Sequence, residues 1–224
     1  MTADPALNLV DKTIPEPLPK NKYFVVSVRS VYHRNHNILP FSIRKKLNLV
    51  SKDYYNEINI FKDDIASIVE DTIERYGYRA HFLNTYTGKE MSAEDDIFTN
   101  SIISKISLNN REKISIINPE YTPAQIKRHL KNAEFILSVP LHPLILGASE
   151  GVPVMSLAYA SKNRCFMEQM HLERFIYNVE KIGDRINKNL IKNDINEVVL
   201  NRDRWNEKII NRAKYLKNNE NFSK

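Results

Sequence analysis

Residues 138–162 read SVPLHPLILGASEGVPVMSLAYASK and pass from a strand into a helix and back into a strand. The apolar run EFILSV at 134–139 ends in Pro-Leu-His-Pro, and proline lacks the backbone N–H that a central strand requires. A helix pattern of small and apolar residues follows at once, and Gly151 is suited to end it. The run at 152–159 again has the composition of a strand. This β-α-β unit places His142 at the start of its helix.

The rest of the chain repeats the same alternation of short apolar runs and longer amphipathic ones. The expected strands are 23–29, 79–86, 113–118, 134–139 and 152–159, and the helices that follow them cover about 55–77, 93–108, 122–133, 141–150 and 161–170. Five such units predict an α/β fold with a doubly wound, Rossmann-like parallel sheet in the order of about 3-2-1-4-5. Ligands of these sheets bind outside the carboxyl ends of the strands where the order reverses. Arg29 and His142 stand at those ends.

Three segments are expected along the chain. Residues 1–22 are rich in proline and resemble a linker between domains, so we expect that something precedes them. Residues 23–181 form the Rossmann-like domain, and residues 182–224 form C-terminal helices. The last pattern is that of a single helix over about 195–216, which gathers apolar residues around Trp205 on one face, and this face must cover another surface.

Composition narrows the class of protein without identifying a ligand. The 224 residues are 42% hydrophobic and 27% charged, and no segment approaches the roughly 18 apolar residues of a membrane span. A net charge of +6 is compatible with nucleic acid, an anionic membrane surface or a small anionic substrate. The single cysteine, Cys165, excludes an intrachain disulfide framework, and no secretory signal pattern opens the chain. We therefore expect a cytoplasmic protein.

Several common sites are disfavoured by the motifs. The chain has only 5 glycines and contains neither G-x-G-x-x-G nor G-x-x-x-x-G-K-[ST], which disfavours glycine-loop nucleotide binding. His33 and His36 have no cysteine or carboxylate at metal-ligand spacing, so we expect a solvated loop and no metal site. Tyr159 and Lys162 are one residue too close for the Tyr/Lys pair of short-chain dehydrogenases.

Cationic and polar residues gather instead at one edge of the predicted sheet. His142 lies in the first turn of a helix, where free backbone N–H groups favour an anion, although it could simply cap or pack there. Arg29 could hold a carboxylate or phosphate in a bidentate manner, although an exposed arginine at a strand end is common. Lys162 is a third cation, and the hydroxyls of Ser138 and Ser161 are candidate hydrogen-bond donors to a phosphate. Together these residues favour a small polyanion.

At this point the sequence resembles a known family. The run at 133–176 is similar to the C-terminal signature of the polysaccharide pyruvyl transferases. In that signature a strand ends in Arg-Leu-His, a small-residue helix and Gly-Val-Pro follow, and Tyr-x-x-Lys precedes a helix. Supporting similarities are DPAL at 4–7, the strand VSVR that ends in Arg29, and the Asp95-Asp96 pair that is expected to open the second crossover helix.

The resemblance implies a glycosyltransferase-B-like enzyme with two Rossmann-like halves, of which this chain is the C-terminal one. Such an enzyme moves the enolpyruvyl group of phosphoenolpyruvate onto a sugar or lipid-linked oligosaccharide as a ketal, in cell-surface, cell-wall or exopolysaccharide synthesis. It uses no other cofactor and no nucleic acid. By this resemblance His142 is the catalytic acid, and the donor-binding residues are Arg29, Leu141, Lys162, Ser138 and Tyr159.

The same resemblance places the enzyme in the cytoplasm, with peripheral association at the inner membrane face. It also implies that the apolar face around Trp205 docks on a missing N-terminal half, without which this chain would be inactive.

One departure from the family pattern leaves two other readings open. Pro140 stands where the family has the arginine of Arg-Leu-His, so one expected cation for the donor is missing. Proline cannot replace the hydrogen bonds of that arginine. The alternatives are a domain that binds a nucleotide sugar, as in glycosyltransferases and epimerases, and a degenerate domain without catalysis.

Overall fold

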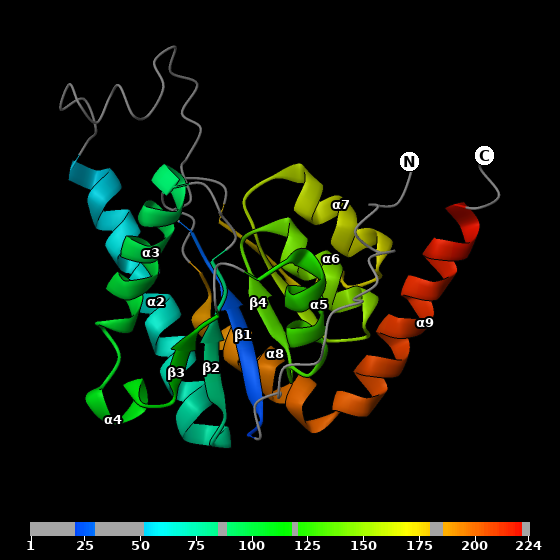
Figure 1. Cartoon of the computed structure of the whole chain (residues 1–224), viewed down its shortest axis with the longest axis horizontal. Coiled ribbons are helices and arrows are strands. Elements are labelled where there is room, and N and C mark those ends of the chain that lie inside the picture. Colours follow the sequence, from blue (N-terminus) through cyan, green and yellow to red (C-terminus); the bar gives the residue numbers. More distant parts are fainter. Residues whose placement is uncertain (1–20, 30–51, 85–88, 118–120, 180–185, 221–224) are drawn as a thin grey trace, which may run out of the picture.

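The core of the protein is a parallel sheet of six strands in the order β3-β2-β1-β4-β5-β6 (Figure 1). The computed structural model describes residues 21–29, 52–84, 89–117, 121–179 and 186–220. The strands are β1 Tyr23–Ser27, β2 Arg79–Phe82, β3 Ile114–Ile116, β4 Ile136–Ser138, β5 Val154–Ala158 and β6 Ile176–Asn178. The predicted α/β class and the order of the first five strands are confirmed, and β6 extends the sheet by one strand that was not predicted.

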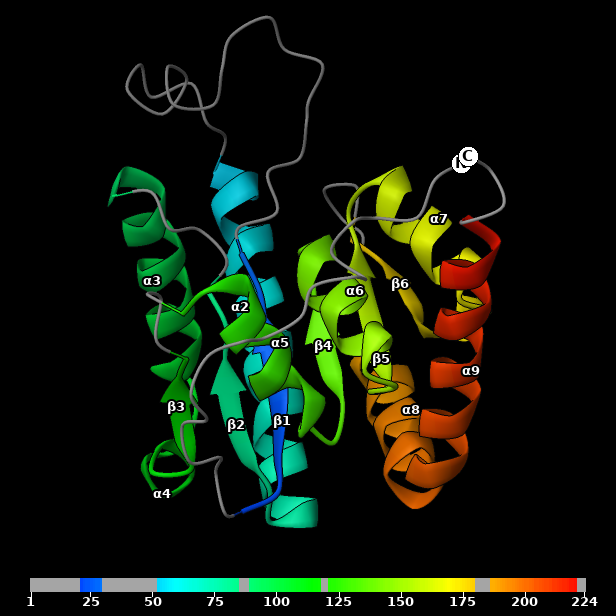
Figure 2. The same ribbon diagram turned by 45° about the vertical axis from the view of Figure 1, so that its right-hand side comes forward.

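Helices cover both faces of this sheet (Figures 1 and 2). On one face lie α2 Lys52–Tyr76, α3 Lys89–Ile103, α4 Leu108–Arg111 and α8 Lys188–Leu200. On the other lie α5 Pro123–Lys131, α6 Leu141–Ser149 and α7 Ser161–Gln169, with α9 Arg202–Glu220 against α6. Because both faces are covered, the central strands β1, β4 and β5 are almost completely buried and carry mostly apolar side chains, whereas the edge strands β3 and β6 are partly exposed.

Local sequence signals account for the ends of several helices. Thr122 caps α5 through a capping box with Gln125, in which Pro123 occupies the first helical position, as predicted. Gly77 and Gly151 follow α2 and α6 with φ of +69° and +81°, a conformation that costs glycine little.

Glycine also allows one helix to approach the sheet closely. A Cβ atom added to Gly147 of α6 would lie 2.1 Å from the Cδ1 atom of Ile136 in β4. Ile136 is itself completely buried, so its side chain has little room to give way. The axis of α6 therefore lies directly against β4.

The C-terminal region differs from the single final helix that was expected. Asn201 separates α8 from α9, and its side chain donates a hydrogen bond to the carbonyl of Glu197 at 3.1 Å. The two helices diverge, so that α8 packs on α2 and α9 packs on α6. The apolar face expected to dock on a missing domain is covered by the chain itself: Ile209 is completely buried, and the Trp205 ring meets Phe175 at 4.9 Å.

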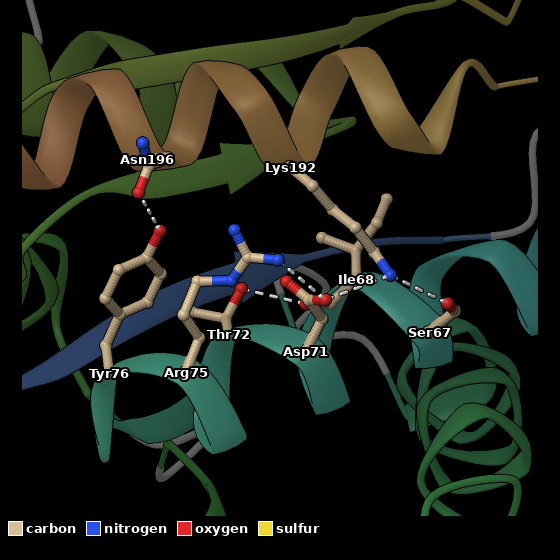
Figure 3. A network of polar contacts seen from close by, with 8 residues as sticks. All are labelled: Ser67, Ile68, Asp71, Thr72, Arg75, Tyr76, Lys192 and Asn196. Carbon is tan, nitrogen blue, oxygen red and sulfur yellow. Dashed lines mark hydrogen bonds and ion pairs between the residues drawn. The ribbon is translucent and has the colours of Figure 1, made fainter.

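Polar contacts fasten α8 to α2 along the middle of both helices (Figure 3). Lys192 lies 3.2 Å from the Ser67 hydroxyl and 3.4 Å from the Asp71 carboxylate. Nearer the end of α2, the Tyr76 hydroxyl donates to the Asn196 side chain at 2.9 Å. These contacts make the C-terminal helices part of the same domain as the sheet.

Two buried polar clusters add to the packing of the sheet. In the first, the Asp194 carboxylate of α8 accepts hydrogen bonds from Arg174 at 2.7 and 2.9 Å and from the Tyr177 hydroxyl at 2.8 Å. In the second, His81 of β2 and His129 of α5 face each other with 2.9 Å between Nδ1 of His81 and Nε2 of His129.

The described helices include none that is long and apolar enough to cross a bilayer.

Candidate functional site

Three neighbouring strands carry buried serines in one row: β1 and β4 end in theirs, and that of β5 lies two residues before its end. Ser27 of β1, Ser138 of β4 and Ser156 of β5 lie beside one another in the strand register, and each is at most 1% exposed. The Ser27 hydroxyl donates to the carbonyl of Leu83 at 2.7 Å. These small side chains mark the place where the strand order reverses, which is the ligand-binding edge of doubly wound sheets.

Arg29 and Tyr159 meet above this row of serines, although 130 residues separate them in sequence. Arg29 follows β1 and Tyr159 follows β5, so the two side chains approach each other across the end of β4. The Arg29 Nη2 atom donates a hydrogen bond to the Tyr159 hydroxyl, and its guanidinium carbon lies 5.0 Å from the centre of the Tyr159 ring. Two residues predicted to bind the donor are therefore direct neighbours.

The turn from β4 into α6 is held by hydrogen bonds on both sides. The Val139 N–H donates to the Ser27 carbonyl at 2.8 Å, which extends the pairing of β4 with β1. The Ser138 hydroxyl donates to the Pro140 carbonyl at 2.7 Å. Ser138 is completely buried and its proton is already engaged, so it shapes this turn and would have to rotate before it could donate to a ligand.

His142 is displayed at the start of α6, as predicted. Pro140 is the residue before the helix, with φ −64° and ψ 144°, and Leu141 is the first helical residue. His142 is exposed, Leu141 packs in part against the core, and Pro143 is buried in the first turn. A missing N–H at Pro143 costs no helical hydrogen bond, since the first four N–H groups of a helix have no partner within it.

The first turn of α7 carries three polar residues with different surroundings. Ser161 and Lys162 are exposed beside the carboxyl end of β5. Asn163, which the sequence interpretation overlooked, is completely buried. Its Nδ2 atom donates to the Val139 carbonyl at 2.9 Å and lies 3.5 Å from the Ser156 hydroxyl. The sequence did contain a signal, because Asn163 occurs at helical spacing with the apolar Met167 and Met170, which places it on the buried face of α7.

The chain matches one known family over most of its length. The sequence model of the family described as polysaccharide pyruvyl transferase matches residues 1–161 of the 224, from the start of the chain to the first residue of α7. The chain belongs to the polysaccharide pyruvyl transferase family. No curated protein and no solved structure matches it. The family match contains Arg29, His142 and Tyr159, whereas Lys162 and Asn163 lie just beyond it.

The Asp95-Asp96 pair of this pyruvyl transferase family chain lies inside α3 instead of opening it. The helix begins at Lys89, so the expected start was wrong. Asp96 accepts a hydrogen bond from the Asn84 side chain at 2.5 Å, and Asn84 in turn accepts one from Thr99 at 2.8 Å. These bonds tie the chain after β2 to α3.

Other residues considered in the sequence lie outside the described part of the chain. These are the DPAL run at 4–7, the linker-like segment up to residue 20, and His33 and His36. Within the described ranges, no group of three or more histidine, cysteine, aspartate or glutamate side chains could hold a metal ion.

Proposed function

We propose that this chain is the donor-binding half of a polysaccharide pyruvyl transferase and that it binds phosphoenolpyruvate at the carboxyl edge of β1, β4 and β5. The observation that carries the proposal is the pairing of Arg29 with Tyr159 across the end of β4, the strand that leads into His142. An arginine held by a tyrosine hydroxyl and ring is preorganised for bidentate contact with a carboxylate or phosphate. Lys162 and the first N–H groups of α6 would add to the attraction for the anion.

In this proposal His142 is the general acid of the transfer. Its imidazolium gives a proton to the methylene carbon of the enol, which forms a C–H bond and leaves the adjacent carbon electrophilic. One sugar hydroxyl adds to that carbon and loses its proton. A second hydroxyl displaces phosphate, so phosphoenolpyruvate and a diol yield a pyruvate ketal and inorganic phosphate. The exposure of His142 leaves its ring accessible to such a donor.

The acceptor and the setting of the reaction belong to the proposal as well. The acceptor would be a sugar or lipid-linked oligosaccharide used in cell-surface or exopolysaccharide synthesis, on the cytoplasmic side of the membrane. A second Rossmann-like half would supply the acceptor contacts. We expect this chain alone to bind phosphoenolpyruvate weakly and not to turn over.

A phosphorus NMR titration tests the donor site. Wild-type protein should perturb the phosphoenolpyruvate signal, and Arg29→Gln should weaken binding about 10-fold or more, since a hydrogen bond to a charged group contributes about 1.5–3 kcal/mol. Lys217→Gln, which removes an exposed positive charge from α9, is the matched control and should bind like wild type. A signal that does not move, or equal losses for both variants, would contradict the proposal. A thermal shift with UDP-sugars but not with phosphoenolpyruvate would favour a nucleotide-sugar donor.

Restoring the family arginine should strengthen donor binding. The φ and ψ of Pro140, −64° and 144°, are accessible to any residue, so Pro140→Arg can be made without backbone strain. We expect phosphoenolpyruvate to bind about 10-fold more tightly, because one charged hydrogen bond is regained. Pro140→Gln separates the loss of proline from the gain of charge and should show no such increase. If both variants bind like wild type, residue 140 does not face the donor.

A further inference from the structure

Asn163 is buried at the point where three elements of the candidate site meet. It belongs to the first turn of α7, contacts the end of β4 through the Val139 carbonyl at 2.9 Å, and lies 3.5 Å from Ser156 of β5. Its side chain is completely buried. The hydrogen bond to Val139 joins residues 24 positions apart, so it links two separate crossover units.

Both backbone polar groups of Val139, three residues before His142, are hydrogen-bonded. Its N–H is bound to Ser27 of β1 and its carbonyl to Asn163 of α7. Pro140 follows and cannot donate a backbone hydrogen bond of its own. If the bond from Asn163 is lost, the direction of the chain entering α6 is held from the β1 side and by the Ser138 bond to Pro140, but no longer from the α7 side.

Stability alone gives a weak reason for an asparagine at this position. The Nδ2 atom gains a hydrogen bond to the Val139 carbonyl. Among the described residues the Oδ1 atom has no hydrogen-bond partner, and leaving a buried acceptor unpaired costs free energy of the same order as the bond contributes. The two effects oppose each other, so the net contribution of Asn163 to the free energy of unfolding is small.

We propose that Asn163 is a positioning residue, which holds the Val139 carbonyl and thereby sets the direction in which α6 presents His142. The proposal rests on the proposed function in so far as His142 serves the donor. Asn163 itself is buried beneath this edge and acts through the turn. It adds a buried residue of α7 to the candidate site, two positions beyond the residues covered by the family match.

The test compares Asn163→Leu with Asn110→Leu in protein carrying labelled histidine rings. Asn110 is the matched control because it is also buried and its amide donates to Glu74 at 2.9 Å, on α2. The His142 ring signal is assigned by its loss in His142→Gln. We expect Asn163→Leu to move this signal and to weaken phosphoenolpyruvate binding about 10-fold, whereas Asn110→Leu should change neither.

Asn163→Asp supplies a second test that does not depend on the leucine variant folding. An ionised carboxylate would face the Val139 carbonyl and repel it, whereas the protonated acid can donate a hydrogen bond as the amide does. The difference in the His142 signal between Asn163→Asp and wild type, compared at equal pH, should therefore shrink as the pH falls. A difference that stays constant with pH would overturn the proposal.

The outcomes also separate this proposal from the proposed function. If wild type does not bind phosphoenolpyruvate, the donor assignment fails, but the His142 ring signal still tests the positioning role. If Asn163→Leu leaves that signal and any binding unchanged, or if Asn110→Leu moves the signal equally, Asn163 does not position His142.

Discussion

Replacing Asp194 by alanine should lower the free energy of unfolding by about 3–5 kcal/mol, the cost of breaking a buried ion pair from one side. Asp194 is 1% exposed and accepts two hydrogen bonds from Arg174 and one from Tyr177. After the change the Tyr177 hydroxyl, which is almost fully buried, has lost its acceptor. Arg174 is half exposed and can return to water, which favours the lower end of the range. Burial and the charge of Asp194 both raise the pKa of the Tyr177 phenol, so this hydroxyl remains a donor in the native protein.

Urea denaturation measures this effect, with Asp203→Ala as the control. Asp203 is an exposed acid in the first turn of α9, where a favourable interaction with the helix dipole is worth about 0.3–1 kcal/mol. Adding Tyr177→Phe to Asp194→Ala should recover part of the loss, because the buried hydroxyl is then removed. A loss below about 1 kcal/mol for Asp194→Ala would show that the cluster does not secure β6 to α8.

Acid should destabilise the protein through the pair formed by His81 and His129. Burial, the nearby His129 and then Arg79 lower the pKa of His81 from 6.5 to about 4, and burial also lowers the pKa of His129. Both rings are therefore neutral in the native state at pH 7, whereas the unfolded chain takes up protons below about pH 6.5. Since one pKa unit corresponds to about 1.4 kcal/mol, His81 alone should remove about 3 kcal/mol of stability between pH 6.5 and pH 4. Above pH 7 this pair contributes no pH dependence.

His81→Phe isolates that contribution. The centres of the Tyr23 and His81 rings lie 4.3 Å apart, so phenylalanine at position 81 keeps a ring against Tyr23. Phenylalanine cannot take up a proton. Denaturation curves measured between pH 4 and pH 8 should show a smaller fall in stability for the variant at the acid end. Between pH 7 and pH 8 the stabilities of the variant and of wild type should run parallel. Equal slopes from pH 6.5 to pH 4 would show that the pair does not carry the acid sensitivity.

Much of the fold could be predicted because its central strands are buried on both faces. Continuous apolar runs such as EFILSV, together with glycine stops such as Gly151, identify strands and helix ends locally. The sixth strand was missed because β6 has only three residues. Its Tyr177 is buried with a hydrogen bond to Asp194, a partner that the local sequence pattern does not indicate. The break at Asn201 was missed for a similar reason, since the apolar spacing runs through it without interruption.

The candidate site could be predicted in part, from strand ends and from family resemblance. Arg29 and His142 were placed at the reversal of strand order by topology, and their strands do adjoin there. The contact of Arg29 with the Tyr159 ring depends on the directions of two side chains that are two strand spacings apart. The hydrophobic periodicity of the sequence does not predict these directions. Asn163 was overlooked because its importance comes from a carbonyl 24 residues earlier in the chain.

The close contact between Gly147 of α6 and Ile136 of β4 limits how α6 can move against the sheet. With a glycine at the contact and a completely buried isoleucine beneath it, α6 cannot slide or tilt without displacing β4. We therefore expect the helix that carries His142 to move together with β4 at the centre of the sheet. If a donor binds here as proposed, any closure around it would come from the group that approaches this edge, while His142 stays in place.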